Sequence, residues 1–130
     1  LLAMDLDRFK GINDQLGHAA GDTALCEFAR RIESSVRGHD LVARLGGDEF
    51  VVLMEDIAEA GEAEAAGLRL LEVMREPMLL AGQHREVGTS IGLALCHGAH
   101  GATELMAAAD AALYRAKAAG RGRIEISTLD

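Results

Sequence analysis

A chain of 130 residues can build one hydrophobic core, and 49% apolar with 26% charged residues is the composition of a folded domain rather than a disordered segment. The formal net charge of −8 argues against a general nucleic-acid binder, which needs a basic face, but allows a small anionic substrate neutralised by a metal or a local pair of basic residues. No apolar run approaches the roughly 20 residues that cross a bilayer and no signal peptide is recognisable, so we expect a cytoplasmic location, either free or as part of a membrane-anchored protein.

The first four residues (LLAM) have the pattern of the middle of a buried strand. Because a natural chain rarely begins in this way, we expect residues 1–130 to be a single domain excerpted from a longer polypeptide, with its N-terminal part missing. The strand ends at Asp5-Leu6-Asp7, and the next segment, 9–14 (FKGIND), predicts a tight turn and a short helix.

A long helix and a β-hairpin are predicted next. Gly17 and Gly21 indicate a loop, after which apolar residues at three- and four-residue spacing form one helical stripe: Leu25, Phe28, Ala29 and Ile32. The segment 37–40 (RGHD) should end this helix. Two short apolar runs, 41–45 and 50–54, then flank the turn 46–49 (GGDE), which is the pattern of a β-hairpin.

The second half of the sequence predicts two more helices and further strands. Residues 57–75, rich in Ala, Glu and Leu, should be helical and stop near Pro77. Residues 81–83 (AGQ) predict a turn between two strands, of which the second is 87–95. The final elements are a helix over 103–118 and a short strand over 124–126. This order predicts an α+β fold with a mainly antiparallel central sheet flanked by helices.

The two cysteines, Cys26 and Cys96, are isolated and lack CxxC spacing, which predicts neither a zinc site nor a disulfide framework. We expect both to be buried free thiols in a reducing cytosol. Four histidines show no ligand spacing and are expected at the surface: His39, His84, His97 and His100.

The hairpin turn carries two adjacent carboxylates, Asp48 and Glu49, which repel each other and gain little from packing. One interpretation is a solvated turn, with glycines for geometry and acids for solubility. The other is a metal site, because successive strand side chains point to opposite faces and a neighbouring strand could bring Asp5 beside Asp48. Two carboxylates with a backbone carbonyl such as that of Leu6 would suit magnesium and its phosphates.

The sequence closely resembles the GGDEF-domain family of diguanylate cyclases in four segments that keep their order and spacing: 5–22 (DLDRFKGINDQLGHAAGD), 44–50 (RLGGDEF), 90–92 (SIG) and 108–121 (AADAALYRAKAAGR). From first to last they extend over residues 5–121, so the match in order and spacing covers nearly the whole chain. The resemblance implies a nucleotide-cyclase-like sheet with a ferredoxin-like core. It also implies an enzyme that condenses two GTP into cyclic di-GMP and two pyrophosphates with Mg²⁺ or Mn²⁺.

The resemblance assigns the metal to Asp5, Asp48 and Glu49, with the Leu6 carbonyl completing the protein ligands. Asp48 and Glu49 are the implied catalytic residues. Glu49 would lie near the attacking ribose 3′-hydroxyl, either as the base that takes its proton or only as a metal ligand.

The sequence contains no Walker loop (GxxxxGK[ST]) that could bind the phosphates. The resemblance assigns them instead to the backbone N–H groups of Phe9 and Lys10, at a helix start, and to the side chains of Lys117 and Arg121. Alternatively, these last two residues only complement the negative end of a helix dipole.

The implied guanine contacts are Asn13 and Asp22, since one carboxylate can accept the adjacent N1–H and N2–H donors of the base. The alternatives are an Asn in a turn and an Asp that caps a helix beginning near Thr23. His18, in the same segment, is assigned a structural role.

Arg37 and Asp40 match an RxxD pattern five residues ahead of the signature, which in this family forms an inhibitory site for the product. Arg can clamp phosphate or stack on guanine. The alternative is a surface salt bridge after a helix. The sequence departs from the family at one position: Asn often follows the arginine that matches Arg121, whereas this chain has Gly122. How the preceding helix ends is therefore not fixed by the resemblance.

The reaction needs two facing GTP molecules, whereas one domain offers one site. The resemblance therefore implies a homodimeric, transient pair of domains under the control of a fused sensor or EAL domain, with no nucleic-acid partner. The alternatives are a catalytically silent module that binds GTP or cyclic di-GMP, a structural dimerisation domain, and a cyclase acting within one nucleotide. Degenerate members usually lose the signature acids, and this chain retains Asp5, Asp48 and Glu49.

Overall fold

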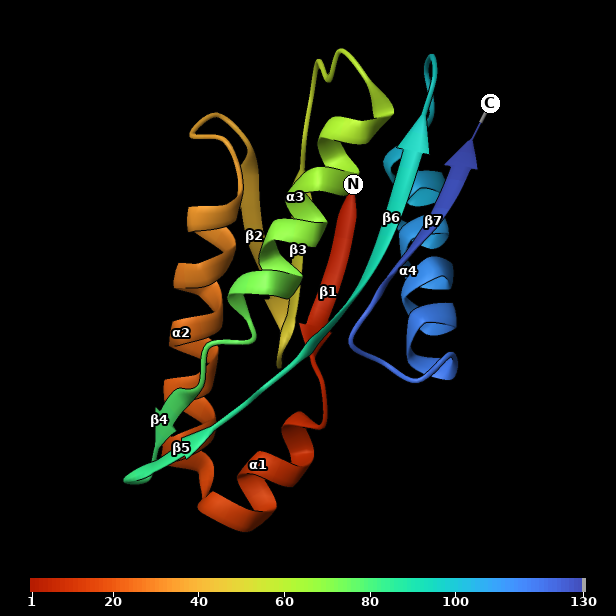
Figure 1. Ribbon diagram of the computed structural model, residues 1–130. Coiled ribbons are helices and arrows are strands. Elements are labelled where there is room, and N and C mark those ends of the chain that lie inside the picture. Colours follow the sequence, from red (N-terminus) through yellow and green to blue (C-terminus); the bar gives the residue numbers. More distant parts are fainter. Residues whose placement is uncertain (130) are drawn as a thin grey trace.

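The apolar opening run forms the central strand of a five-stranded sheet. β1 (Leu2–Leu6) is buried throughout and pairs antiparallel with β3 (Glu49–Leu53) on one side and with β6 (Thr89–Cys96) on the other. β2 (Leu41–Gly46) and β7 (Ile124–Leu129) form the edges, which gives the order β2-β3-β1-β6-β7 (Figure 1). The computed structural model describes residues 1–129.

Helices cover both faces of this sheet (Figure 1). α2 (His18–Ser35) and α3 (Ala60–Val73) lie on one face, and α4 (Ala102–Ala118) lies on the other. The remaining elements lie near the end of β1: they are α1 (Phe9–Leu16) and a two-stranded ribbon of β4 (Met78–Leu80) and β5 (Gln83–Arg85).

The alternation of side chains along the strands separates two apolar clusters. Leu2, Met4 and Leu6 join the larger cluster with α2 and α3, where the rings of Phe28 and Phe50 meet edge-to-face with centroids 5.2 Å apart. Ala3 belongs to the smaller cluster beneath α4. Small residues on that face bring α4 close to the sheet, so its C-terminal end lies beside the end of β1.

One strand pair departs from the antiparallel pattern. β6 and β7 are parallel because α4 connects them as a crossover, whereas the other strand pairs described are antiparallel. The predicted α+β fold with a mainly antiparallel central sheet is confirmed.

Three local predictions were wrong. Gly21 does not lie in a loop, because α2 begins at His18 and includes it. The turn at 81–83 joins β4 to β5, since Ala81 and Gly82 adopt φ values of 51° and 78° and reverse the chain at once. The predicted strand 87–95 corresponds instead to the separate strand β6, which begins at Thr89 and ends at Cys96. Cys26 and Cys96 are free, as predicted, but exposed.

None of the helices within residues 1–129 combines the length and apolar character needed to span a membrane.

Candidate active site

The signature segment forms a tight turn between β2 and β3. Gly47 has a φ of 53°, a conformation that favours glycine, and the strand register shifts between Arg44 and Gly46. Arg44 Nε donates to the Gly47 carbonyl at 2.8 Å and so ties the turn to β2. The turn therefore holds Asp48 at a fixed position at the end of the sheet.

Asp48 reaches the end of β1, as predicted. Its Oδ2 accepts a hydrogen bond from the Leu6 N–H at 3.1 Å, which joins residues 42 positions apart. Because Met4 lies opposite Phe50, continuing the same register places Asp5 opposite Glu49. Strand alternation then puts Asp5 and Glu49 on the α4 face of the sheet.

The carboxylate of Asp5 is buried and only partly neutralised. Its Oδ2 forms an ion pair with Lys117 Nζ, while its Oδ1 is buried without a hydrogen-bond partner. Burial raises the pKa of Asp5; Lys117 opposes this shift, and the nearby charges of Asp48 and Asp7 add to it. An unpaired anionic oxygen at this position favours a cation.

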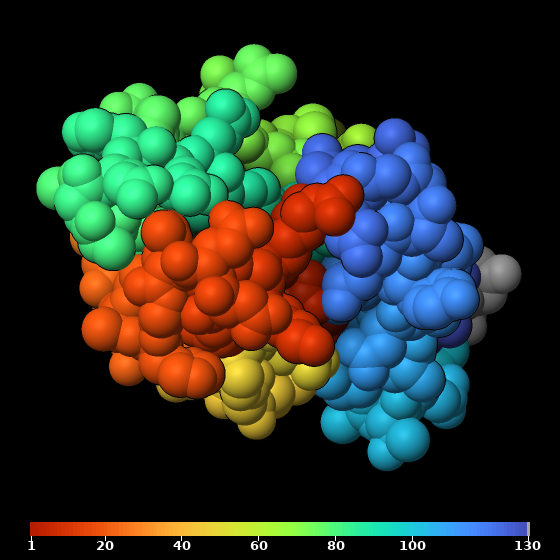
Figure 2. Space-filling model, turned by 90° about the horizontal axis from the view of Figure 1, so that it is seen from below, coloured from red at the N-terminus to blue at the C-terminus, as the bar shows by residue number. Residues whose placement is uncertain are grey.

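A hollow of about 280 Å³ opens at this end of the sheet, and we call it the strand-end hollow. Its lining residues are Asp5, Leu6, Asp7, Arg8, Phe9, Lys10, Asp48, Lys117 and Arg121. Figure 2 shows the molecule recessed here, between the orange α1 region, the yellow β2–β3 turn and the blue end of α4. The hollow thus unites Asp5 and Asp48, whose approach the strand pattern predicted, with Lys117 and Arg121, which only the family resemblance had linked to them.

The start of α1 faces the same hollow. Arg8 precedes the helix in a left-handed conformation, with a φ of 59°, and no side chain caps the helix. The N–H groups of a first helical turn have no partner within the helix, so those of Phe9 and Lys10 can receive an anion.

The C-terminal end of α4 is closed by a Schellman motif. The Arg121 N–H donates to the Ala116 carbonyl at 3.0 Å and the Gly120 N–H donates to the Lys117 carbonyl at 3.2 Å. Gly122 continues in the left-handed region with a φ of 60°, and its N–H donates to Asp7 Oδ2 at 3.0 Å. Gly122 therefore does not weaken the helix end, a question that the sequence had left open.

The implied guanine contacts lie away from the hollow, where α1 meets α2. The Asn13 side chain lies against Gly21: a Cβ at Gly21 would come within 1.9 Å of Asn13 Oδ1. Asp22 is exposed on α2. It cannot cap the helix, since α2 begins at His18, so that alternative is wrong.

The RxxD residues form a pair of their own, remote from the strand-end hollow. Arg37 donates to Asp40 through its backbone N–H at 2.7 Å, its Nε at 3.0 Å and its Nη2 at 2.7 Å. Both residues line a separate hollow of about 320 Å³. The salt bridge of the simpler alternative is present, and product binding stays a prediction.

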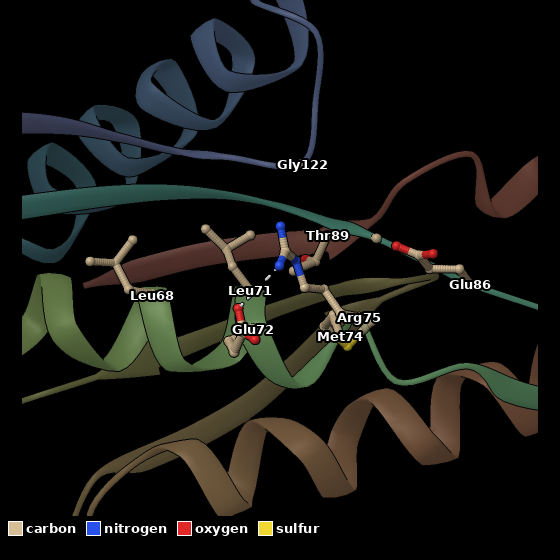
Figure 3. A pocket seen from close by; sticks show the side chains of 9 residues that line it. Leu68, Leu71, Glu72, Met74, Arg75, Glu86, Thr89 and Gly122 are labelled. Atoms are coloured by element: carbon tan, nitrogen blue, oxygen red, sulfur yellow. Dashed lines mark ion pairs between the residues drawn. The ribbon is translucent and has the colours of Figure 1, made fainter.

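A further hollow of about 460 Å³ lies between α3 and the start of β6, and we call it the α3 hollow (Figure 3). Leu68 and Leu71 line it, and the Arg75 side chain extends across it while paired with Glu72. Gly122 lies on its far edge. The α3 hollow contains none of the residues that the sequence analysis assigned to a site.

The donor set suits a metal that arrives with phosphates. Among residues 1–129 no three His, Cys, Asp or Glu side chains are grouped closely enough to hold a metal ion by themselves. Magnesium commonly takes one or two carboxylates and completes its shell with substrate phosphates and water. The unpaired Asp5 Oδ1 and the nearby Asp48 fit that pattern.

Two residues in the hollow had escaped the sequence analysis. Asp7 and Arg8 both line it, and Asp7 also binds Gly122 and Ser90. The sequence signals for Asp7 are its position two residues after Asp5, at the end of a buried strand, and its place in the segment 5–22 that resembles the family.

Comparisons with known proteins agree with one another. The family described as "Diguanylate cyclase, GGDEF domain" matches residues 1–123. The chain is 43% identical to the diguanylate cyclase TpbB of Pseudomonas aeruginosa over 100% of this chain and 30% of that protein. It is 46% identical to the bifunctional diguanylate cyclase/cyclic di-GMP phosphodiesterase MucR of the same species, over 93% of this chain and 18% of that one. It therefore spans less than a third of these relatives.

Solved structures give the same result. The crystal structure of the GGDEF domain of YfiN (TpbB) from Pseudomonas aeruginosa superimposes with a TM-score of 0.90 at 40% identity, covering 99% of this chain and 81% of that one. The GGDEF domain of DgcB from Caulobacter crescentus, solved in complex with cyclic di-GMP, gives a TM-score of 0.84 at 28% identity, with 96% and 75% covered.

Proposed function

Since the chain belongs to the diguanylate cyclase GGDEF-domain family, we propose that it condenses two GTP molecules into cyclic di-GMP and two pyrophosphates. The observation that carries this proposal is the strand-end hollow, in which acidic and basic residues from distant parts of the chain meet beside the unpaired Asp5 Oδ1. A magnesium triphosphate is a ligand that can satisfy both charges at once.

The metal would be held by the Asp5, Asp48 and Glu49 carboxylates and the Leu6 carbonyl. When bound, magnesium lowers the pKa of a ligating hydroxyl and neutralises phosphate charge. These residues supply hard oxygen ligands where β1 ends and β3 begins, and the burial of Asp5 limits competition from water.

Bond formation occurs twice. The ribose 3′-oxygen of one GTP attacks the α-phosphorus of the other, the bond from that phosphorus to the bridging oxygen breaks, and pyrophosphate leaves with the electron pair. Each attack releases one hydroxyl proton. Glu49 shares a sheet face with Asp5, and we assign it the acceptance of that proton.

The triphosphate would lie between the start of α1 and the end of α4. The N–H groups of Phe9 and Lys10 bind it from one side, and the side chains of Lys117 and Arg121 bind it from the other. Without nucleotide Lys117 pairs with Asp5, so phosphate oxygens would share this ammonium group after binding.

Asn13 and Asp22 are our candidates for selecting guanine. The Asn13 side chain on α1 lies against Gly21 of α2, and Asp22 is the next residue of α2. Both can therefore approach one base at the junction of the two helices. The Asp22 carboxylate can accept the N1–H and N2–H donors together, an arrangement that adenine does not offer.

Two such sites must face each other, so the active species would be a two-fold pair of domains brought together by the rest of the protein. Arg37 and Asp40 would bind the product and so limit the rate of its synthesis. The Arg37 guanidinium would then bind a phosphate of the product in place of the Asp40 carboxylate.

The test uses the chain fused to a dimeric coiled coil, incubated with GTP and Mg²⁺, with the products separated by chromatography. We expect cyclic di-GMP and pyrophosphate, and a loss of about 100-fold or more in rate for Glu49→Ala. Glu125→Ala, a half-buried glutamate on β7, is the matched control and should retain the wild-type rate. GTP bound without turnover would indicate a silent module instead.

A further inference from the structure

Asp7 connects three parts of the chain at the edge of the strand-end hollow. Its Oδ1 accepts from Ser90 Oγ on β6 at 2.5 Å, and its Oδ2 accepts from the Gly122 N–H at 3.0 Å. Its own N–H donates to the Gly88 carbonyl at 2.9 Å. The two side-chain contacts join residues 83 and 115 positions apart, so Asp7 links the end of β1 to the start of β6 and to the loop after α4.

The loop after α4 has an unusual backbone. Gly120, Arg121 and Gly122 all have positive φ, at 117°, 64° and 60°. For Arg121 this left-handed conformation is unfavourable, because its Cβ approaches the backbone closely. The Arg121 N–H is already bonded within its own segment, to the Ala116 carbonyl, and the hydrogen bond from the adjacent Gly122 N–H to Asp7 adds a link from outside that segment.

Packing alone does not hold this loop. Gly122 also borders the open α3 hollow, where Figure 3 shows it on the loop across from Arg75. Asp7 fits closely against Gly88, since a Cβ at Gly88 would lie 2.9 Å from Asp7 Oδ2. The carboxylate of Asp7 therefore bonds the loop at Gly122, while the Arg121 N–H and the Arg123 carbonyl bond to α4 and to Ile91.

We infer that Asp7 is a positioning residue for the triphosphate: by holding Gly122 it sets the place of Arg121 relative to Asp5 across the strand-end hollow. The inference rests on the proposed function, since it assigns Arg121 to the phosphates. Asp7 acts through two accepted hydrogen bonds, not through its charge.

The neutral variant Asp7→Asn separates these roles. Its amide oxygen can accept the Gly122 N–H while its amide nitrogen donates to the Ser90 oxygen, so both links survive without the charge. Asp7→Ala loses both. We expect Asp7→Ala to raise the KM for GTP about tenfold in the coiled-coil dimer with a small change in kcat, and Asp7→Asn to stay within about threefold of wild type.

Combining Asp7→Ala with Arg121→Ala gives the second readout. If Asp7 works through Arg121, the double variant should be no worse than Arg121→Ala alone; independent roles would multiply the two losses. The affinity for GTP with Mg²⁺, measured by calorimetry on the same proteins, shows whether binding follows the same pattern when turnover is absent. A wild type that binds GTP but makes no cyclic di-GMP would therefore contradict the proposed function and still test Asp7.

Two results would overturn the inference. One is an Asp7→Asn variant as impaired as Asp7→Ala, which would assign Asp7 to direct contact with the cation. The other is multiplicative losses in the double variant. Melting temperatures identify variants that fail to fold, and if Asp7→Ala does not fold, the KM of Asp7→Asn decides alone.

Discussion

The Asp40 side chain has no exposed area, although the residue borders a hollow at the surface. Burial by itself would raise the pKa of Asp40, but the hydrogen bonds from Arg37 hold it below the ordinary value of 3.8. The unfolded chain therefore takes up this proton at a higher pH than the folded protein does. The pair stabilises the fold above pH 3.8 and loses its contribution as the pH falls toward the lowered pKa.

We expect Asp40→Asn to lower the Tm at neutral pH by about 5 °C and to differ less from wild type as the pH falls below 3.8. Thermal unfolding followed by circular dichroism across this pH range measures the difference. Asp110→Asn, exposed on α4, is the control and should match wild type throughout. A Tm difference that does not change with pH would show that the charge of Asp40 is not what stabilises the fold.

Some residue positions could be predicted from sequence patterns and others could not. The convergence of Asp5 and Asp48 was predictable, because a buried strand and a hairpin with alternating side chains leave few ways to pair. The role of Asp7 was not, since it depends on Ser90 and Gly122, which are distant in sequence. Cys26 was expected inside because cysteine usually is, but it lies on the outer face of α2.

Two glycines allow close packing at helices α2 and α4. Gly21 indicated a loop because glycine often breaks helices, yet here it sits inside α2 and leaves room for the Asn13 side chain. Gly92, in the SIG segment, performs a similar role on β6: a Cβ there would lie 2.2 Å from the Ala109 carbonyl oxygen and 2.3 Å from the Leu113 nitrogen. Backbone atoms of α4 therefore pack directly on Gly92, a contact that local sequence patterns do not reveal.

We expect Gly92→Ala to lower the free energy of unfolding by about 3 kcal/mol, because α4 must move away from the sheet to admit a methyl group. Lys117 and Arg121 would move with it, so GTP binding should fall as well. Urea unfolding measures the first effect. Gly61→Ala, on α3 with open space around it, is the control and should be neutral or stabilising by up to about 1 kcal/mol. Equal stability of both variants would contradict the close packing of α4.

At the scale of the whole molecule, charge is unevenly distributed. The chain carries a formal net charge of −8, yet four basic residues line the strand-end hollow against three acidic ones. An acidic surface with a locally balanced site disfavours polyanions and still admits a nucleotide triphosphate that brings its own cation. The hollow also lies at the end of the sheet, beside the hairpin turn (Figure 2).

The central claim is that Asp5 and Asp48 hold a divalent cation over a triphosphate at the end of β1. A crystal structure with Mn²⁺ and a non-hydrolysable GTP analogue, in which an anomalous difference map locates the manganese, tests it most directly. We predict a manganese peak bound to Asp5 and to phosphate oxygens, with Lys117 and Arg121 on the triphosphate. Manganese bound away from Asp5, or a triphosphate in the α3 hollow, would contradict the assignment.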